Sequence, residues 1–392
     1  MREPARLQAA IEILDSVIAA ARTEGAAADT LVQRYFATRR YAGSKDRAAV
    51  RALVYGAIRA LGDVPVSGRA AMLGYAEGLA PQLLPMFDGS PHAPAVPVTE
   101  DPRAVLGAAP AWLMDRLHVR FGAALENETA ALLGRATMDL RINRLKTADV
   151  AAVRAALPVA SAPPQGLPIP LPFALRLAEG VALDTHPLMQ DGVIEVQDVG
   201  SQLVTALGAA QPGETVIDLC AGAGGKTLAL AADMAGIGAL IACDTDRGRL
   251  QAMAPRLVRA GADAYVEARL LNPGRESEQL ADLAGKADLV LIDAPCSGTG
   301  TWRRNPELKW RLTEDRLARL VGIQARLMHI GASLVRPGGR LVYAVCSVLR
   351  EEGEVQASAF ALAMGARETA RLALSPAANG CDGFFVASFE MR

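Results

Sequence analysis

The chain has few cysteines and no long apolar segment, and both shortages exclude classes of protein. Its 392 residues include 5 cysteines, none in a Cys-x-x-Cys pair, which argues against a disulfide framework, a zinc knuckle or any other metal site. No apolar run has the length of a membrane span, and the N-terminus lacks the pattern of a signal peptide. The balance of 41 basic against 42 acidic residues neither indicates nor excludes a nucleic-acid partner. We therefore expect a cytoplasmic protein of two or three domains without membrane contact.

Two of the cysteines follow apolar runs, and this is the most informative feature that is present. One run, Asp-Leu-Val-Leu-Ile-Asp-Ala-Pro-Cys, covers 288–296, and the other, Arg-Leu-Val-Tyr-Ala-Val-Cys, covers 340–346. Each run predicts a short buried strand. Because ligands bind beyond the carboxyl ends of strands in an open α/β sheet, we predict that Cys296, Cys346 and Asp293 lie at a ligand site. The alternative, two small buried hydrophobic thiols, is less favoured because the two positions match and one has a carboxylate beside it.

The periodicity of apolar residues changes along the chain and predicts several parts. Residues 5–75 carry helical spacing, and residues 81–102 are dense in proline and lack periodicity. From residue 192 onward, short apolar strands alternate with helical patterns, which is typical of a parallel sheet covered on both faces. The predicted parts are a helical domain (1–80), a proline-rich linker (81–105), a small α+β module (106–185) and an α/β domain (186–392).

The predicted helical domain is locally basic. Its basic cluster consists of Arg34, Arg39, Arg40, Lys45, Arg47, Arg51 and Arg59. A surface that contacts phosphates and a solvated helical face are equally compatible with this cluster.

A glycine-rich loop follows the first predicted strand of the α/β domain. It lacks the glycine that a P-loop needs at position 220, and Thr227 stands where the dinucleotide fingerprint has its third glycine. Asp244 ends the next strand, about 20 residues later, where an acid can accept hydrogen bonds from both hydroxyls of a ribose. A helix N-cap is the other role open to Asp244. We interpret the loop and the acid as a site for an adenosyl ligand such as S-adenosylmethionine.

These motifs together resemble the Sun/RsmB family of RNA cytosine-C5 methyltransferases. The strongest similarity is Asp-Ala-Pro-Cys-Ser-Gly-Thr-Gly-Thr-Trp-Arg-Arg-Asn-Pro-Glu-Leu-Lys-Trp over 293–310. The segments 343–354 and 220–227 resemble the second cysteine motif and the cofactor loop, and 197–203 and 382–385 are also similar. The resemblance implies a Rossmann-like S-adenosylmethionine-dependent methyltransferase sheet, an all-helical NusB-like RNA-binding domain and a small α+β connecting module. Within the family it points to a monomer that methylates small-subunit ribosomal RNA.

The resemblance also implies roles for individual residues. Cys346 would add to C6 of the base and so make C5 nucleophilic. Asp293 would bind the N3/N4 edge of the base, and Cys296 would assist removal of the C5 proton and release of the product. The implied cofactor contacts are Cys220, Ala221, Gly222, Ala223, Gly224, Gly225, Lys226, Asp244 and Asp293. The implied phosphate contacts are Arg303, Arg304 and Lys309, for which a solvated helix start is the alternative.

The sequence departs from the family pattern and leaves other functions open. Gly222-Ala223 stand where the family has Ala-Pro, Val345 replaces a threonine, and Gly353 replaces an asparagine. The alternatives are a DNA cytosine methyltransferase, whose nucleophile lies in the Pro-Cys motif, a methyltransferase for another RNA such as tRNA, and a non-catalytic RNA-binding assembly factor. A zinc protein is disfavoured because the strand-end cysteines lack paired spacing. Base stacking and core packing are both open for Trp302 and Trp310.

Overall fold

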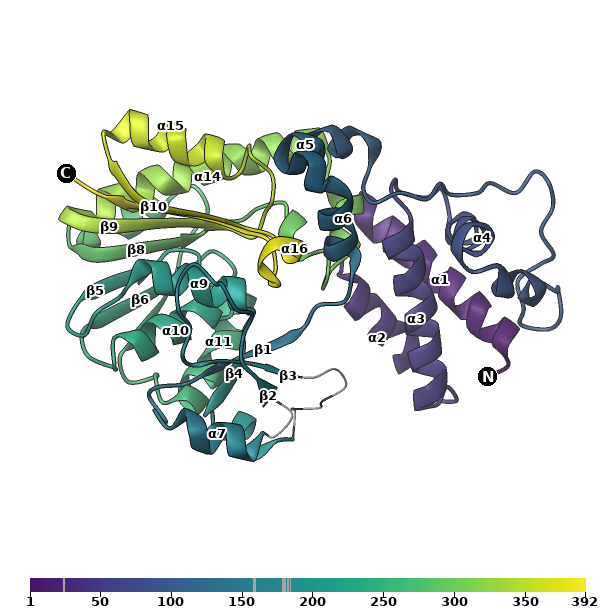
Figure 1. Ribbon diagram of the computed structural model, residues 1–392, viewed down its shortest axis with the longest axis horizontal. Coiled ribbons are helices and arrows are strands. Elements are labelled where there is room, and N and C mark those ends of the chain that lie inside the picture. The colour runs from purple at the N-terminus through teal and green to yellow at the C-terminus, as the bar shows by residue number, and fades with distance from the viewer. Residues whose placement is uncertain (24, 158–159, 178–180, 182, 184) are drawn as a thin grey trace. The chain divides into compact units, whose positions relative to one another are not determined.

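The chain folds into two compact units. The computed structural model describes residues 1–392 except 24, 158–159, 178–180, 182 and 184 (Figure 1). One unit, the helical unit, contains residues 1–135 and 301–316. The other, the sheet unit, contains residues 136–300 and 317–392. Each unit is therefore assembled from stretches of chain that are far apart in sequence.

The helical unit is held together by the apolar faces of its helices. In α1 (Glu3–Arg22), buried Leu7, Ile11, Leu14 and Ile18 recur at helical spacing and join one hydrophobic cluster with the helices around them. The predicted helical character of the N-terminal part is therefore confirmed. The other elements of the unit are α2 (Ala28–Ala37), α3 (Ser44–Ala60), α4 (Gly68–Leu79), η1 (Pro81–Met86), α5 (Ala111–Phe121), η2 (Gly122–Ala124), α6 (Leu125–Leu133) and α13 (Leu308–Arg311).

The sheet unit contains a central sheet of seven strands in the order β10-β11-β9-β8-β5-β6-β7. The strands from β9 to β7 run parallel, whereas β10 and β11 extend one edge antiparallel. The strands are β5 (Thr215–Asp218), β6 (Ala239–Asp244), β7 (Val266–Leu270), β8 (Ala287–Asp293), β9 (Val335–Val345), β10 (Arg367–Leu374) and β11 (Phe384–Glu390). The predicted parallel sheet is thus present, with an antiparallel pair added at its edge.

Helices cover both faces of this sheet (Figure 1). Successive side chains of β8 point to opposite faces, so Leu289 and Leu291 pack in one hydrophobic cluster with α9, α10 and α11. Val290 and Ile292 pack in the other cluster with α14 and α15. The helices and short helical segments of this part of the unit are α9 (Val199–Gly208), α10 (Gly225–Asp233), α11 (Arg247–Ala260), α12 (Glu276–Gln279), η3 (Ala281–Leu283), η4 (Thr299–Thr301), α14 (Glu314–Leu334), α15 (Glu354–Met364) and α16 (Pro376–Asn379).

A second, smaller sheet has four antiparallel strands in the order β2-β3-β1-β4. Buried Leu140, Ile142 and Ile194 of its strands share a small core with α7 and α8. The elements are β1 (Met138–Ile142), α7 (Val150–Ala156), β2 (Ala160–Ser161), β3 (Ala174–Leu177), α8 (Pro187–Gln190) and β4 (Ile194–Val196). Because β4 pairs with β1, the small sheet continues past the predicted module boundary at residue 185.

The compact units divide the chain differently from the predicted parts. Helices α5 and α6, placed by the sequence in the module 106–185, belong to the helical unit. So does the segment 301–316, placed by the sequence within 186–392. None of the helices in the described part of the chain is long and apolar enough to cross a membrane. The described residues also hold no group of three or more His, Cys, Asp or Glu suited to a metal ion.

Candidate active site

The two strand-end cysteines meet at one edge of the central sheet. Strands β8 and β9 are parallel neighbours, with Asp293 in register with Ala344. Cys296 and Cys346 follow these strands, and their sulfur atoms lie 3.3 Å apart. Both side chains are partly exposed, so a ligand can reach them. The fold therefore brings together two thiols that the sequence separates by 50 residues.

The environment distinguishes the two thiols. The hydrogen bond between the two sulfurs raises the pKa of Cys296 well above its usual value, and burial raises it further. Either sulfur can be the donor in this hydrogen bond. A thiolate is the form of cysteine that attacks as a nucleophile, and the raised pKa of Cys296 disfavours that form at this residue.

Lys226 and Asp293 form an ion pair beside the cysteines. The Lys226 Nζ lies 2.6 Å from Asp293 Oδ2 and 5.4 Å from the centre of the Phe384 ring. Burial lowers the pKa of Lys226, but the charges of Asp293 and Cys346 outweigh burial and raise the pKa overall. The site thus holds a positive charge close enough to Cys346 to interact with its sulfur.

The glycine-rich loop has the backbone shape that a closely approaching ligand needs. Gly222 and Gly224 have φ angles of +56° and +85°, which side chains other than glycine rarely allow. A Cβ atom at Gly222 or Gly225 would meet open space, so these backbone positions are accessible. Asp244 accepts a hydrogen bond from the Gly222 N–H at 2.7 Å. The N-cap of α11 is Asp246, so the capping role considered for Asp244 belongs to its neighbour.

Asp218 is a candidate site residue that the sequence analysis did not assign. It ends β5 beneath the glycine-rich loop and is fully buried. Its Oδ2 accepts a hydrogen bond from the Thr227 hydroxyl at 2.7 Å, whereas Oδ1 has no hydrogen-bond partner. Burial raises the pKa of Asp218 to about 7. An unpaired buried acceptor in this position suits a donor group on a ligand, and its signal in the sequence was an acid at a strand end just before the glycines.

The remaining predicted loop residues lie in the same turn. Cys220 is partly exposed, and burial raises the pKa of its thiol well above the usual value. The Ala221 N–H donates to the Cys243 carbonyl at 2.8 Å, which ties the loop to β6. The predicted cofactor residues from 220 to 226 are therefore contiguous, with 220–224 in the turn after β5 and Gly225 and Lys226 at the start of α10.

Side chains on β4, just after it and on α11 hold the glycine-rich loop in place. Glu195 of β4 is 2 % exposed and accepts hydrogen bonds from Arg256 at 3.0 Å and Arg259 at 2.9 Å. The other Nη of Arg256 donates to the Ala223 carbonyl at 2.6 Å. The Gln197 amide donates to the Gly225 carbonyl at 3.2 Å. Two loop carbonyls are therefore held by side chains from outside the loop, an arrangement that local sequence could not indicate.

The three predicted phosphate contacts lie in the helical unit. Lys309 is fully buried, and its ammonium donates to the carbonyls of Arg59 and Ala108 at 3.1 and 3.2 Å. Burial lowers the pKa of Lys309 to about 7. Arg303 is also buried and donates to a backbone carbonyl of the same unit. The structure thus buries Lys309 completely and leaves only 7 % of Arg303 exposed, which disfavours both as phosphate contacts. Arg304 is partly exposed and remains a prediction.

The tryptophans of the same segment are core residues. Trp302 is 0 % exposed and Trp310 is 3 % exposed, and Trp310 joins the cluster built by α1 and its neighbours. Of the two roles that the sequence left open, packing is the one observed. Burial of the Trp310 ring in that cluster helps to explain why the segment 301–316 belongs to the helical unit.

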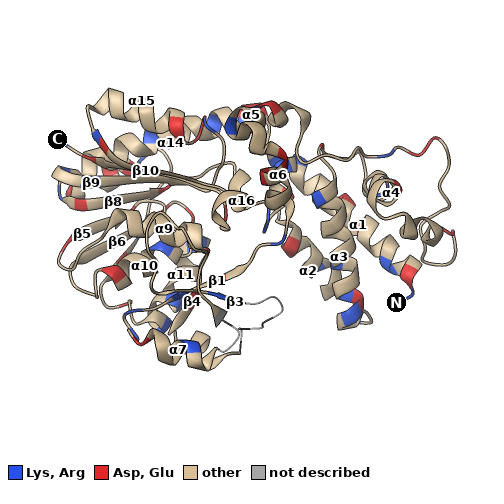
Figure 2. Ribbon diagram, viewed as in Figure 1, with Lys and Arg blue, Asp and Glu red and all other residues tan. Residues whose placement is uncertain are grey.

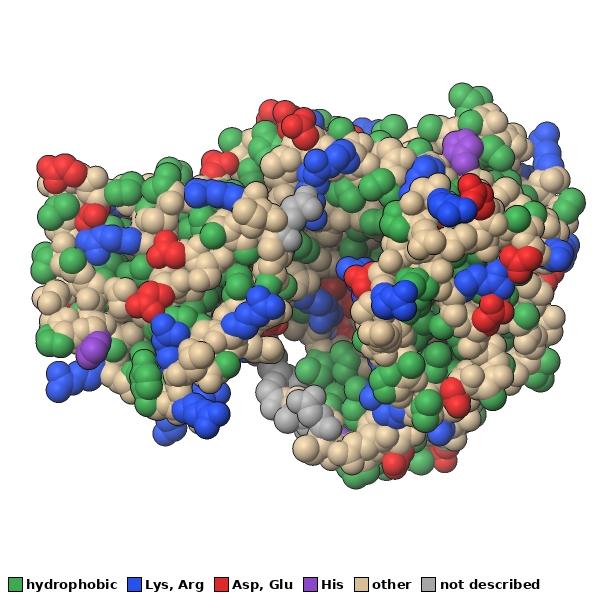
Figure 3. All heavy atoms as spheres, turned by 180° about the vertical axis from the view of Figure 1, so that it is seen from behind, with side chains coloured by type: hydrophobic (Ala, Val, Ile, Leu, Met, Phe, Trp, Pro, Cys, Tyr) green, Lys and Arg blue, Asp and Glu red, His purple; other side chains and the backbone are tan. Residues whose placement is uncertain are grey.

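Basic and acidic residues are mixed along both units. Figure 2 shows Lys and Arg interspersed with Asp and Glu on both units, and the face drawn in Figure 3 mixes both signs with hydrophobic side chains. Within the predicted basic cluster of the helical unit, the exposed members are Arg34, Arg40, Lys45, Arg47 and Arg51.

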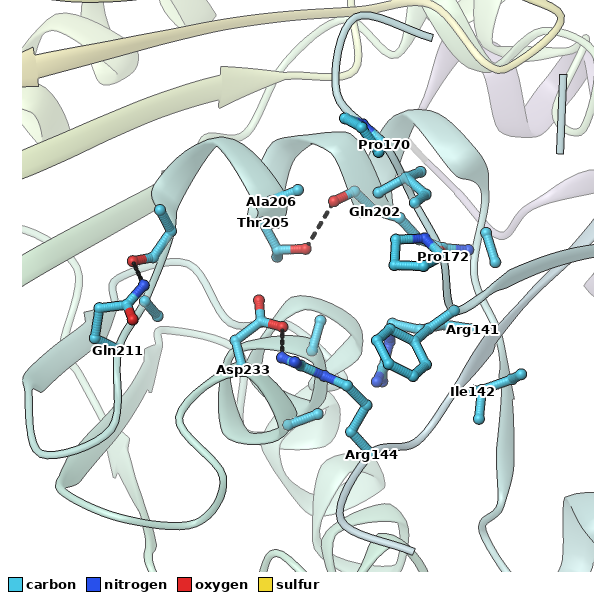
Figure 4. Close-up of a pocket in the computed structure, with 17 residues that line it drawn as sticks. Arg141, Ile142, Arg144, Pro170, Pro172, Gln202, Thr205, Ala206, Gln211 and Asp233 are labelled. Atoms are coloured by element: carbon cyan, nitrogen blue, oxygen red, sulfur yellow. Dashed lines mark hydrogen bonds and ion pairs between the residues drawn. The ribbon is translucent and has the colours of Figure 1, made fainter. Parts of the chain in front are cut away.

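A separate pocket of about 320 Å³ lies within the sheet unit (Figure 4). Its lining includes Arg141, Arg144 and Asp233, and Arg144 is paired with Asp233. None of the predicted catalytic or cofactor residues lines it. The candidate active site is therefore the edge of the sheet at β8 and β9, and not this pocket.

Comparison with known proteins gives a family match for the C-terminal half of the chain. The model of the family described as 16S rRNA methyltransferase RsmB/F matches residues 205–390. These residues, just under half of the chain, are similar to the methyltransferase domain of the RsmB/F family. The predicted resemblance to this family is thereby confirmed, and the matched region contains the glycine-rich loop and both cysteines.

A curated relative and two solved structures extend the similarity. Ribosomal RNA small subunit methyltransferase B of Salmonella arizonae is 34% identical over 292 residues, and the match covers 71% of this chain but only 65% of the relative. The crystal structure of PH0851 has a TM-score of 0.75 and 23% identity over 100% of this chain and 99% of that one. A methyltransferase homologue from Pyrococcus horikoshii has a TM-score of 0.62 and 25% identity over 71% of this chain and 94% of that one. The Rossmann-like methyltransferase fold with a helical N-terminal region is therefore confirmed.

Proposed function

We propose that this protein methylates C5 of a cytosine in small-subunit ribosomal RNA with S-adenosylmethionine as the methyl donor. The observation that carries the proposal is the approach of the Cys296 and Cys346 sulfurs to 3.3 Å beside the Lys226–Asp293 ion pair. A protein that only binds RNA needs neither a pair of thiols nor a charged side chain beside them. The RsmB/F family match supports the choice of RNA over DNA as the substrate.

The residues of the glycine-rich loop fit the proposed cofactor. Open space in front of Gly222 and Gly225 admits a ligand close to the backbone. Asp244 stands at the loop with a carboxylate that can accept hydrogen bonds from ribose hydroxyls, as it now accepts the Gly222 N–H. The unpaired Oδ1 of Asp218 suits the amino group of the cofactor. The bound cofactor supplies an electrophilic methyl group on a sulfonium.

The chain's own residues account for the other steps. The Cys346 thiolate forms a bond to C6 of the cytosine, which places an electron pair on C5 for attack on the methyl group. Asp293 holds the N3/N4 edge of the base while charge develops there. Loss of the C5 proton, assisted by Cys296, then breaks the bond between C6 and sulfur and releases Cys346 as a thiolate. The positive charge of Lys226 stabilises that thiolate before attack and after release.

Cys296 has a different task from Cys346 in this scheme. In the resting site its raised pKa makes it the weaker candidate for the attacking thiolate. After methyl transfer its sulfur, 3.3 Å from that of Cys346, assists the transfer of the C5 proton to water.

Bisulfite sequencing of small-subunit ribosomal RNA tests the function directly. Cells that contain the wild-type protein should carry a protected cytosine that is unprotected in cells without it. Cells with Cys346→Ala should match those without the protein. A protected cytosine that persists in cells without the protein, or none in any sample, would remove ribosomal RNA as the substrate. Methylation of transfer RNA in the same samples would support the other RNA considered for this family.

A further inference from the structure

The residues that follow the two cysteines converge on one buried carboxylate. Glu352 is 0 % exposed. Its Oε1 accepts hydrogen bonds from the Ser297 N–H at 2.8 Å and the Gln324 amide at 3.0 Å. Its Oε2 accepts from the Ser347 hydroxyl at 2.5 Å and from the Ser297 hydroxyl. Since Ser297 follows Cys296 and Ser347 follows Cys346 directly, a single carboxylate is bonded to both cysteine loops.

Further hydrogen bonds close this network. The Thr299 hydroxyl lies 3.2 Å from that of Ser297 and 3.0 Å from that of Ser347. It also accepts the Val348 N–H at 3.0 Å. The Tyr343 hydroxyl donates to the backbone carbonyl of Glu352 at 2.6 Å, which fixes the position of the glutamate itself. Both oxygens of the carboxylate are satisfied, and a fully satisfied buried network holds its members rigidly.

We propose that Glu352 is a positioning residue that sets the distance between Cys296 and Cys346. The proposal rests on the methyl-transfer function proposed above. Glu352 makes no hydrogen bond to either sulfur in the described structure, so it acts through Ser297 and Ser347. Two loops on separate strands can drift apart, and a displacement of about 1 Å can cost about 100-fold in rate. The carboxylate opposes that drift because each loop donates a hydroxyl to the same oxygen.

The geometry favours positioning over a purely stabilising role. An apolar side chain of similar volume fills a core without tying two loops to one point, and replacing a buried polar cluster by apolar groups can leave stability unchanged. Here the bonded partners are the residues next to the cysteines and Gln324 of α14. The same Gln324 amide also donates to the carbonyl of Pro295 at 3.0 Å, one residue before Cys296. The network therefore encloses the first cysteine loop on both sides.

The test replaces Glu352 by an isosteric amide. Glu352→Gln keeps the volume but removes one acceptor, so we expect kcat for RNA methylation to fall about tenfold or more, with the cofactor Kd unchanged. The control is Asp288→Asn at the start of β8, where the carboxylate holds Thr215 and Arg336 far along the strand from the cysteines. This control should keep the wild-type kcat.

A second measurement does not depend on RNA. The rate of alkylation of Cys346 by iodoacetamide, followed by peptide mass spectrometry at neutral pH, should change several-fold in Glu352→Gln, because the contact between the Cys296 and Cys346 sulfurs is disturbed. If Glu352→Gln does not fold, the double variant Ser297→Ala/Ser347→Ala keeps the carboxylate but removes both hydroxyls that donate to it, and it should show the same effect. Wild-type alkylation and kcat in a folded variant would overturn the positioning role. Alkylation that depends on Glu352 in a protein that methylates no RNA would instead overturn the proposed function alone.

Discussion

Two buried glutamates support the two halves of the candidate active site, and they do so differently. Glu195 holds the glycine-rich loop through Arg256 and Arg259, whose side chains are 25% and 29% exposed. Glu352 holds the cysteine loops through neutral hydroxyl and amide donors, in a network closed to solvent. The first support is a set of ion pairs that water can reach, and the second is a dry set of hydrogen bonds.

This difference suggests what each half must do. A cofactor loop must admit and release a ligand in every cycle, and arginines at the surface can adjust while they remain paired. The cysteine loops must hold two sulfurs at a fixed separation, which a dry and saturated network achieves. We therefore expect damage to the first support to appear in cofactor affinity and damage to the second to appear in kcat.

The largest effect is expected at the cysteines themselves. Cys346→Ala should lose methylation entirely and form no covalent complex with RNA, because it lacks the attacking sulfur. Cys296→Ala should attack and methylate the base but stall before release, so an RNA–protein adduct should survive denaturing electrophoresis. An adduct found in Cys346→Ala and absent from Cys296→Ala would exchange the two roles, as in DNA cytosine methyltransferases.

A smaller effect, a loss of cofactor affinity, is expected when Asp244 is replaced. Asp244→Ala removes the proposed acceptor for the ribose hydroxyls, and a hydrogen bond to a charged group contributes about 1.5–3 kcal/mol, which is roughly 10- to 100-fold in affinity. Calorimetry with S-adenosylmethionine measures this Kd directly. The nearby Asp246→Ala, which removes the N-cap of α11 and an exposed ion pair with Arg249, is the matched control. Equal affinity in wild type and Asp244→Ala would exclude Asp244 from the site.

Replacing Glu195, which supports the glycine-rich loop, should also weaken cofactor binding, but less than Asp244→Ala does. Glu195→Gln keeps the side-chain volume but weakens both ion pairs, so Arg256 holds the Ala223 carbonyl less firmly. We expect the cofactor Kd to rise up to about tenfold, in line with the loss of a charged hydrogen bond, while kcat at saturating cofactor stays near wild type. A fall in kcat with unchanged Kd would contradict the division of labour between Glu195 and Glu352.

The raised pKa of Asp218 predicts that the free energy of unfolding depends on pH. Its pKa is raised by burial to about 7 in the folded protein, so folding favours its protonated form. That contribution to stability is complete below the unfolded pKa near 4 and is lost as pH rises toward 7, with a slope of at most about 1.4 kcal/mol per pH unit. Urea unfolding of wild type and Asp218→Asn at pH 5 and pH 7 measures the change. The difference between the two proteins should vary with pH, and a constant difference would show that Asp218 does not titrate in this range.

The smallest effect is expected at the surface of the helical unit. Exposed Arg40 and Lys45 are candidates for binding phosphates, and removing one such charge should lower the slope of log Kd against log salt by about 1. Arg40→Gln and Lys45→Gln should therefore weaken RNA binding modestly at low salt and leave cofactor affinity intact. Titrations of RNA at several salt concentrations measure the slope, and an unchanged slope in both variants would place the RNA elsewhere.

Several features of the site could be predicted from sequence because they depend on local pattern. The apolar runs before Cys296 and Cys346 predicted two buried strands, and the glycines before Lys226 predicted a tight turn next to a ligand. Strand ends in a parallel sheet share one edge, so the meeting of the two cysteines followed from the pattern. The phosphate contacts at Arg303 and Lys309 did not follow, because charge in a sequence does not reveal whether a side chain is buried.

By itself, then, the sequence determined the strands, the glycine-rich turn and the residues able to do chemistry, since these depend on neighbours along the chain. Only the tertiary structure decided that Glu352 joins both cysteine loops and that Glu195 supports the cofactor loop from another sheet. It also decided that the segment carrying Trp302 and Trp310 packs in the helical unit, although the cysteine just before it belongs to the sheet unit. The physical reason is the same in each case: buried carboxylates and large rings need partners, and those partners come from parts of the chain that only folding brings together.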